Sequence, residues 1–172
     1  DPTGASLRKA FLKTPIEFGR MSSGFNKKRF HPVLKKVKPH LGTDYAAPKG
    51  TPIRAVGSGT IIKSEYKRNN GHYVKIRHNA TYETQYLHMS KRLVKVGDVV
   101  KQGDVIGKVG STGLATGPHV CFRFWKHGQQ VDHRQEAFPP DTPVRDDMMD
   151  AFAVEVNRLE LEADSMLSVQ SR

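Results

Sequence analysis

The chain has 172 residues, 37% of them hydrophobic and 26% charged, a composition typical of one folded domain with its own core. The formal net charge is 28 − 17 = +11, and the single cysteine excludes an internal disulfide. No apolar run approaches the roughly 20 residues that a membrane-spanning helix needs, so the sequence predicts no integral membrane segment.

The positive charge is unevenly distributed. Residues 141–172 hold 3 basic and 8 acidic side chains, a net of 3 − 8 = −5, which leaves 11 + 5 = +16 for residues 1–140. A basic body is typical of an anionic partner such as nucleic acid, a membrane surface or a bacterial cell wall, and also of an ordinary solvated surface. Without a basic motif interleaved with aromatic residues, we expect no nucleic-acid partner. The chain starts without Met or a signal-peptide pattern, so we expect possible upstream domains.

The first part of the chain predicts little regular structure. Residues 1–14 are expected to form a linker with a short helix over residues 4–14, which Pro15 ends. Residues 16–25 are typical of a strand with a turn, and residues 26–39 of a basic loop. Short strands broken by turn residues are predicted next, over residues 52–56, 59–64, 72–78, 81–88 and 120–125.

Two patterns complete the predicted elements. A small repeat places Gly-Asp turns six residues apart, at Gly97 and Gly103, each followed by two β-branched residues. This repeat indicates tight corners in a compact sandwich or barrel. From Asp141 onward apolar residues recur at helical spacing, which predicts a helical tail. We therefore expect an all-β, mainly antiparallel domain over residues 15–138 and an acidic helical tail over residues 139–172.

A late run of β-branched and aromatic residues places His119 and Cys121 two residues apart. In a strand alternate side chains share a face, so His119 and Cys121 project together. The alternate residues Val120, Phe122 and Phe124 then face the core. Two groups that can ligate a metal on one rigid strand are a candidate site, although a lone cysteine is also common as a small buried hydrophobic residue.

His40 and Asp44 lie four residues apart, beside Pro39 and Gly42, which disfavour a helix. An extended segment also places such residues on one face, so both side chains can converge on one ion. A catalytic zinc typically has three protein ligands and an open position for water, and His40, Asp44 and Cys121 make such a set. The alternative is a turn histidine with a capping aspartate.

A hydrolytic zinc site also needs groups that orient the water, take its proton and stabilise the oxyanion. His88, at the end of a predicted strand, and His119 could do this as non-ligands. The remaining histidines, His31, His78, His127 and His133, are interpreted as surface residues, and His72 as a residue near the site.

Eight motifs, in one order and at fitting intervals between about residues 15 and 132, resemble the lysostaphin/LytM-type zinc metallopeptidases. They are Pro39-His40-x-Gly42-x-Asp44, Gly50-Thr51-Pro52, Gly71-x-Tyr73-Val74, Tyr86-Leu87-His88, Val96-Gly97-Asp98, Gly103-Asp104-x-Ile106-Gly107, Ser111-Thr112-Gly113 and Thr116-Gly117-Pro118-His119. The resemblance is closest to Gram-negative periplasmic members that cut peptide crosslinks of peptidoglycan. It implies an antiparallel β-sandwich with a groove across one sheet, a Zn²⁺ cofactor, peptidoglycan as partner, and the bacterial cell envelope (periplasm) as location.

The resemblance also implies roles for individual residues. The family's metal ligands fall on His40, Asp44 and Cys121, and its catalytic histidines on His88 and His119. Cys121 is a departure, because the family has histidine there, and Arg123 stands where an acidic residue is common. Thiolate is a good zinc ligand, although two anionic ligands would cancel the charge of the metal and weaken it as a Lewis acid.

Two alternatives follow from these departures and from the repeat. The first is a catalytically weak or inactive LytM-type module that binds cell wall and activates an amidase. The second is a biotinyl- or lipoyl-type carrier, in which Gly-Asp turns also recur. The chain lacks the exposed Met-Lys-Met hairpin of such carriers, and the carrier hypothesis leaves the histidines unexplained.

Overall fold

The computed structural model describes residues 10–28, 30–31, 36–37, 39–138 and 145–170. Contacts divide the chain into two units, one spanning Phe11–Ala137 and the other made of Asp1–Ala10 with Phe138–Arg172. Among the described residues, all β-strands lie in the first unit and the single α-helix lies in the second. The domain boundaries expected from the sequence, at residues 14/15 and 138/139, stay predictions.

The strands of the first unit are short and follow one another closely, as the frequent turn residues predict. They are β1 (Arg20–Ser23), β2 (Phe30–His31), β3 (Lys36–Val37), β4 (Thr43–Ala46), β5 (Pro52–Arg54), β6 (Gly59–Lys67), β7 (Gly71–Arg77), β8 (Tyr82–Arg92), β9 (Val99–Val100), β10 (Val105–Val109), β11 (His119–Lys126) and β12 (Gln129–Val131). β2 and β3 pair with each other inside the segment predicted as a basic loop.

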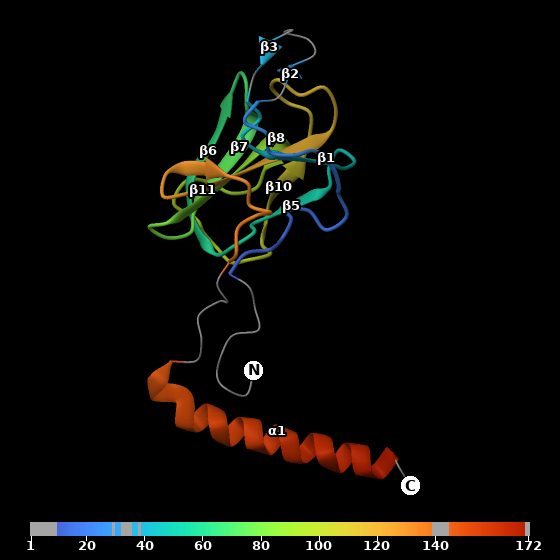
Figure 1. Cartoon of the computed structure of the whole chain (residues 1–172), viewed down its shortest axis with the longest axis vertical. Coiled ribbons are helices and arrows are strands. Elements are labelled where there is room, and N and C mark those ends of the chain that lie inside the picture. The colour runs from blue at the N-terminus through green and yellow to red at the C-terminus, as the bar shows by residue number, and fades with distance from the viewer. Residues whose placement is uncertain (1–9, 29, 32–35, 38, 139–144, 171–172) are drawn as a thin grey trace. The chain divides into compact units, whose positions relative to one another are not determined.

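The other ten strands form one sheet with the order β1-β4-β11-β8-β7-β6-β9, and every pairing in it is antiparallel. β8 pairs with β11 and β7 on its two sides and, over residues 89–92, with β10, which in turn pairs with β5. β6, β7 and β8 lie side by side in Figure 1. The predicted all-β, antiparallel class is therefore confirmed, with the strands joined into one continuous sheet.

The core lies against the face of β11 that the alternation predicted. Val120, Phe122 and Phe124 are at most 1% exposed. The ring of Tyr86 on β8 packs against Phe122 at 5.3 Å between centroids, and Phe11 packs edge-on against Phe124 at 5.2 Å. This apolar layer leaves the opposite face of β11 and its neighbours available for polar groups.

The two Gly-Asp turns have the same local chemistry, as their repeat predicted. Gly97 and Gly103 have φ of 93° and 91°, a left-handed conformation that favours glycine. The carboxylates of Asp98 and Asp104 each accept a hydrogen bond from the amide three residues earlier, at 2.9 and 2.7 Å. These side-chain bonds close each turn and lead into β9 and β10.

The predicted N-terminal helix is wrong over residues 10–14, which are not helical, and residues 4–9 lie outside the described residues. The amide of Leu12 donates to the carbonyl of Val56 at 2.7 Å. Phe11 is buried among the rings of His78, Tyr82 and Phe124. Contacts with distant residues therefore hold this segment extended against the core.

In the second unit a 3-10 turn, η1 (Asp146–Met148), precedes α1 (Met149–Gln170) (Figure 1). The predicted helix start at Asp141 lies outside the described residues. Along α1, Arg158 forms ion pairs with Glu155 and Glu162, which stabilise the helix surface. No helix among the described residues is both long and apolar enough to cross a membrane.

Candidate active site and metal centre

Three neighbouring strands carry most of the predicted site residues. In the register of the sheet Cys121 on β11 lies opposite Asp44 on β4, and on its other side opposite Leu87 on β8. His119 is two residues before Cys121 on the same face, and His40 lies just before β4, in a bridge with Asn26. The antiparallel pairing of β4, β11 and β8 therefore brings together residues that are up to 81 positions apart.

His40, Asp44 and Cys121 converge so that their ligand atoms all lie within 4.8 Å of one another. Nε2 of His40 is 3.1 Å from Oδ1 of Asp44 and 3.7 Å from Sγ of Cys121. Ligand atoms arranged tetrahedrally at ordinary zinc bond lengths would be roughly 3.3–3.8 Å apart. The spacing of the His40 ring from the other two ligand atoms is thus close to that of a zinc site.

The backbone fixes the orientation of every imidazole ring in the site. In each ring Nδ1 lies at hydrogen-bond distance from a main-chain carbonyl, so the proton sits on Nδ1 and the lone pair of Nε2 faces the site. The bonds are His40 to Gly24 at 2.9 Å, His119 to Gly117 at 2.8 Å and His88 to Thr112 at 2.7 Å.

This tautomer has a direct consequence for His40 and Asp44. With its proton on Nδ1, the Nε2 of His40 presents a lone pair to a carboxylate oxygen only 3.1 Å away. Two acceptors at that distance repel each other unless a cation, either a proton or a metal ion, lies between them. The pair is therefore arranged for a shared cation, which is the role expected of metal ligands.

The electrostatics of Asp44 favour its anionic form. Burial raises the pKa of this carboxyl, but the hydrogen bond and charge of His40 and the hydrogen bond from Cys121 outweigh burial, and the pKa lies below its usual 3.8. Burial and the charge of Asp44 raise the pKa of the Cys121 thiol to about 12, while Arg123 acts in the opposite direction. A metal that binds this thiol as thiolate must displace its proton.

His88 reaches the site through an irregularity in β8. Its φ is 63°, a left-handed value that histidine adopts more readily than most side chains. The register of β7 against β8 shifts between His72 and Val74, which makes room for one extra residue on β8. The His88 amide donates to the carbonyl of Asn70 at 2.9 Å, and its ring lies 4.7 Å from that of His119. The bulge therefore places the two histidines side by side.

Burial also sets the protonation state of His88. Its desolvation, reinforced by the positive potential of His119 and Arg123, lowers the pKa to about 4, although the Thr112 carbonyl and Asp44 act in the opposite direction. The ring is neutral near pH 7, and its Nε2 can accept a proton.

His119 Nε2 is 4.0 Å from Oδ1 of Asp44, so it also faces the metal-ligand set.

A cavity of about 410 Å³ opens at this site. It lies between β1, β4 and the segment before β11. The groove across one sheet that the resemblance implied stays a prediction. Its lining residues are Ser22, Ser23, Asp44, Ala46, Thr116, Gly117, Pro118 and His119.

Gly42 packs closely against β11 beside Cys121. A Cβ at this position would lie 3.1 Å from Sγ of Cys121, 3.0 Å from Cγ of Arg123 and 2.9 Å from the carbonyl oxygen of Phe122. Arg123 lies on the same strand face, and its buried Nε has no hydrogen-bond partner among the described residues. The absence of a side chain at Gly42 is what lets the His40–Asp44 segment approach β11.

Of the histidines interpreted as surface residues, His133 is buried and His78 is partly so. His133 is 4% exposed, and its Nε2 is 3.0 Å from the hydroxyl of Tyr45. His78 is half-buried, with ring nitrogens 2.8 Å from the Ser58 carbonyl and from the Thr84 hydroxyl. Both fill polar positions between distant segments, which no local pattern reveals.

The other histidines outside the site differ in their surroundings. His127 is exposed, as predicted, and the side chain of His31 lies outside the described residues. His72 lies near the site, as predicted, although the cavity that it lines is a different one.

Sequence reasoning did not identify the carbonyl groups that orient the rings. Main-chain groups leave no signal in residue type, but Thr112 and Gly117 fall within motifs that the resemblance had singled out. Gly24 and Ser23 were missed altogether, because their contact with His40 depends on the pairing of β1 with β4.

Comparisons with known proteins agree with this geometry. A family model described as peptidase family M23 matches residues 38–133. The chain is 50% identical, over 139 residues, to the peptidoglycan DD-endopeptidase ShyC of Vibrio cholerae, which covers 81% of this chain and 32% of that protein. This chain thus spans about a third of the length of such curated relatives.

Solved structures of peptidases are also similar to this chain. A zinc-containing peptidase from Vibrio cholerae matches with a TM-score of 0.73 and 41% identity, covering 77% of this chain and 42% of that one. The catalytic domain of lysostaphin from Staphylococcus simulans matches with a TM-score of 0.59 and 30% identity, covering 66% of this chain and 88% of that one.

Proposed function

The chain belongs to peptidase family M23, and from this premise we propose that it is a zinc-dependent endopeptidase that hydrolyses peptide crosslinks of bacterial peptidoglycan. The observation that carries the proposal is the convergence of His40, Asp44 and Cys121 beside the paired rings of His88 and His119. His40, Asp44 and Cys121 would hold the zinc ion. His88 and His119 would act as the catalytic histidines.

The donor set suits zinc in its chemistry as well as in its spacing. One imidazole, one carboxylate and one thiolate are all established zinc ligands, and three protein ligands leave a position open for water or substrate. Zinc in such a site supplies Lewis acidity, which polarises a scissile carbonyl and makes water more acidic. Because Asp44 and a Cys121 thiolate would together carry two negative charges, a zinc ion held here would be a weaker Lewis acid than with a neutral ligand at position 121.

The two histidines supply the proton transfers. With Nδ1 protons held by the carbonyls of Thr112 and Gly117, both Nε2 atoms carry lone pairs toward the site. Either can take a proton from the attacking water, and the protonated ring can then stabilise the oxyanion or protonate the leaving amine. The fixed tautomers mean that little reorganisation is needed before proton transfer.

The substrate class follows from relatives and from charge. Curated relatives named peptidoglycan DD-endopeptidases cover most of this chain. The body of the chain is strongly basic, which would favour an anionic wall polymer. We place the protein in the bacterial cell envelope, in the periplasm.

The departures at Cys121 and Arg123 favour one other candidate, a weak or inactive LytM-type module that binds cell wall and activates an amidase. It differs from the enzyme in a measurable way. An activator would leave muropeptide crosslinks intact when added alone to sacculi, and it would need no zinc to act.

The experiment that tests the proposal compares the parent chain with Cys121→Ser and Cys121→His. Bound zinc is measured by elemental analysis and crosslink cleavage by muropeptide profiles of digested sacculi. We expect the parent to bind one zinc and cleave, the serine variant to lose zinc, and the histidine variant to keep it. His127→Ala, which changes an exposed histidine outside the site, is the control. Equal zinc occupancy in all variants would show that Cys121 is not a ligand. A parent chain that binds no zinc and cleaves no crosslinks in sacculi would refute the enzyme hypothesis.

A further inference from the structure

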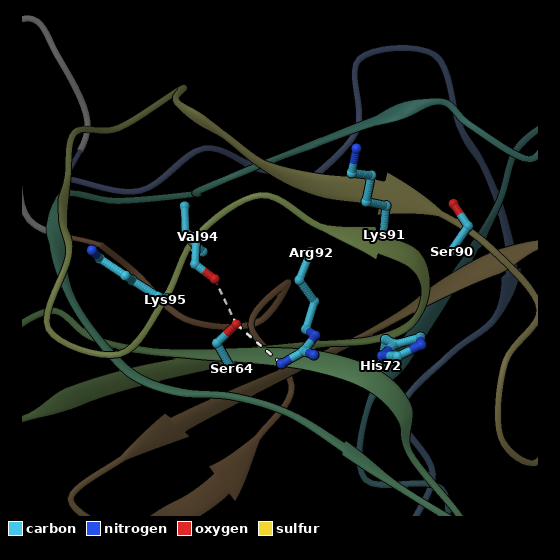
Figure 2. Close-up of a pocket in the computed structure, with 7 residues that line it drawn as sticks. All are labelled: Ser64, His72, Ser90, Lys91, Arg92, Val94 and Lys95. Atoms are coloured by element: carbon cyan, nitrogen blue, oxygen red, sulfur yellow. Dashed lines mark hydrogen bonds between the residues drawn. The ribbon is translucent and has the colours of Figure 1, made fainter.

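A second cavity, of about 410 Å³, is lined by none of the proposed metal ligands and is assigned no role above. Figure 2 shows the residues that line it, which come from β6, β7, β8 and the segment after β8. They are Ser64, His72, Ser90, Lys91, Arg92, Val94 and Lys95. None of these lining residues is acidic, and three carry a positive charge.

The guanidinium of Arg92 is positioned by its neighbours. Nη1 of Arg92 donates to Oγ of Ser64 at 3.4 Å, and Ser64 in turn donates to the carbonyl of Val94 at 2.6 Å. In Figure 2 the guanidinium lies between Ser64 and His72, while Lys91 and Lys95 lie farther from it. One cation of the pocket is thus held in place by its neighbours, and two lysines add positive charge around it.

His72 adds a hydrogen-bond donor. Its Nδ1 is buried and has no hydrogen-bond partner among the described residues. A neutral imidazole with no acceptor at Nδ1 keeps its proton on Nε2, since a buried unpaired N–H is costly. Nε2–H is then a donor that an oxygen ligand can use.

The three cations of this pocket have no acidic partner in the part of the chain that the structure describes. No carboxylate of a described residue forms an ion pair with Lys91, Arg92 or Lys95. Some cations elsewhere do have such partners: Arg134 with Asp132, Lys126 with Glu136, Lys75 with Glu83, Arg145 with Asp147, and Arg158 with Glu155. The counter-charge for this pocket must therefore come from outside the described chain, from solvent ions or from a ligand.

We propose that this pocket is a carboxylate-binding subsite that receives an acidic group of a peptidoglycan stem peptide, with Arg92 as the main contact. The choice of a stem-peptide carboxylate over another oxyanion rests on the proposed function. Stem peptides carry free carboxylates, and a planar guanidinium matches a carboxylate in geometry.

The pocket is joined to the catalytic centre through one residue. The amide of His72 donates to the hydroxyl of Thr112 at 3.0 Å, and the Thr112 carbonyl accepts the bond from Nδ1 of His88 at 2.7 Å. Gly71 packs so closely on Thr112 that a Cβ there would lie 2.3 Å from its hydroxyl. A ligand held by the pocket therefore sits beside the segment that orients a catalytic ring.

The test uses the full 172-residue chain and three probes: a soluble tetrapeptide stem with free carboxylates, the same peptide with its carboxylates amidated, and inorganic phosphate. Nuclear magnetic resonance titrations at low salt follow the amides of Ser64 and His72 and the Nε–H of Arg92. We expect the free peptide to shift these signals and the amidated peptide to leave them in place. Arg92→Gln should weaken peptide binding by about tenfold or more, and Arg92→Lys should keep part of it.

The matched control is Lys13→Gln, which removes one exposed positive charge in a different cavity and should change binding by less than about twofold. Pocket signals that do not move with the free peptide, or equal affinities for Arg92→Gln and Lys13→Gln, would overturn the subsite. Binding of phosphate without binding of the peptide would overturn the stem carboxylate as its ligand.

Cleavage of sacculi separates this inference from the proposed function. A chain that cleaves crosslinks, but whose pocket signals do not shift with the free peptide, has the enzymatic function without the subsite. A chain that binds the peptide in the pocket but neither holds zinc nor cleaves has the subsite without the enzymatic function.

Discussion

Gly42→Ala should damage both the stability of the domain and its metal site, because no space exists for a Cβ at this position. The added atom would lie 2.9 Å from the carbonyl oxygen of Phe122, 3.0 Å from Cγ of Arg123 and 3.1 Å from Sγ of Cys121. Favourable contacts between carbon atoms lie at about 3.5–4.0 Å. The backbone of Phe122 is paired on both sides, with Thr43 and with Tyr86, so it is not free to yield.

The expected cost follows from this geometry. Overpacking of a buried site costs about 1–3 kcal/mol, from which the gain of about 0.4–1 kcal/mol that alanine brings by restricting the unfolded chain must be subtracted. Gly42 has no left-handed φ, so the loss would come from crowding alone. Displacement of Sγ of Cys121 should also lower zinc affinity, by about 10–100-fold.

Gly117→Ala is the matched control, since a Cβ there would meet no atom within 4 Å and the backbone is again not left-handed. It should change stability by no more than about 0.5 kcal/mol and leave zinc affinity intact. Urea denaturation measures the first quantity and competition with a chelating dye the second. If Gly42→Ala were as stable and bound zinc as tightly as Gly117→Ala, the close approach of the His40–Asp44 segment to β11 would be refuted.

Three further outcomes are expected. His40→Ala should lose zinc, whereas His88→Ala should keep zinc and reduce crosslink cleavage by about 100-fold or more. Elemental analysis measures the zinc and muropeptide profiles measure the cleavage. Loss of zinc from both variants would make His88 a ligand. Burial lowers the pKa of His133 to about 4 from 6.5, so between these pH values the unfolded chain binds a proton that the folded chain does not. The free energy of unfolding should therefore fall as the pH drops from about 6.5 to 4, by up to about 3 kcal/mol. Denaturation across this window should show a smaller loss in His133→Gln, and an equal loss would contradict the assignment. Tyr86→Phe should cost about 1–3 kcal/mol in urea denaturation, since the Val56 amide donates to that buried hydroxyl at 3.0 Å; no loss would mean that another acceptor takes over.

The strand alternation of residues 119–124 was predictable because it is a local property. Each residue of β11 needs only its own neighbours to be assigned a face, and the buried Val120, Phe122 and Phe124 confirm the assignment. The Gly-Asp turns were predictable for the same reason, as each is closed by a side chain three residues away. The family resemblance then added an expectation that spacing alone left open, in which His40 is a metal ligand and His88 a catalytic histidine; these roles stay predictions.

Other features depend on contacts between distant segments, and the sequence gives no local signal for them. Residues 10–14 have the composition of a helix, yet Phe11 gains more by packing among three rings of the core. His133 has polar neighbours in sequence and is buried only because Tyr45 and Phe122 lie across from it. The bulge at His88 appears only when β7 is aligned with β8.

The division of β11 into two faces also determines how variants of the site can be interpreted. Val120, Phe122 and Phe124 form one set of alternate residues and pack in the main apolar layer, whereas His119 and Cys121 belong to the other set. Cys121 is itself buried in a small cluster with Tyr73 and Leu87, so a substitution there has to keep its volume. Serine at position 121 changes one atom and keeps the volume nearly constant, so a loss of zinc in that variant would report on ligation and not on folding. A loss of zinc in a Phe122 variant would have no such meaning. Because the proposed metal ligands and the main apolar layer lie on opposite faces of β11, metal binding and stability can be tested with separate variants.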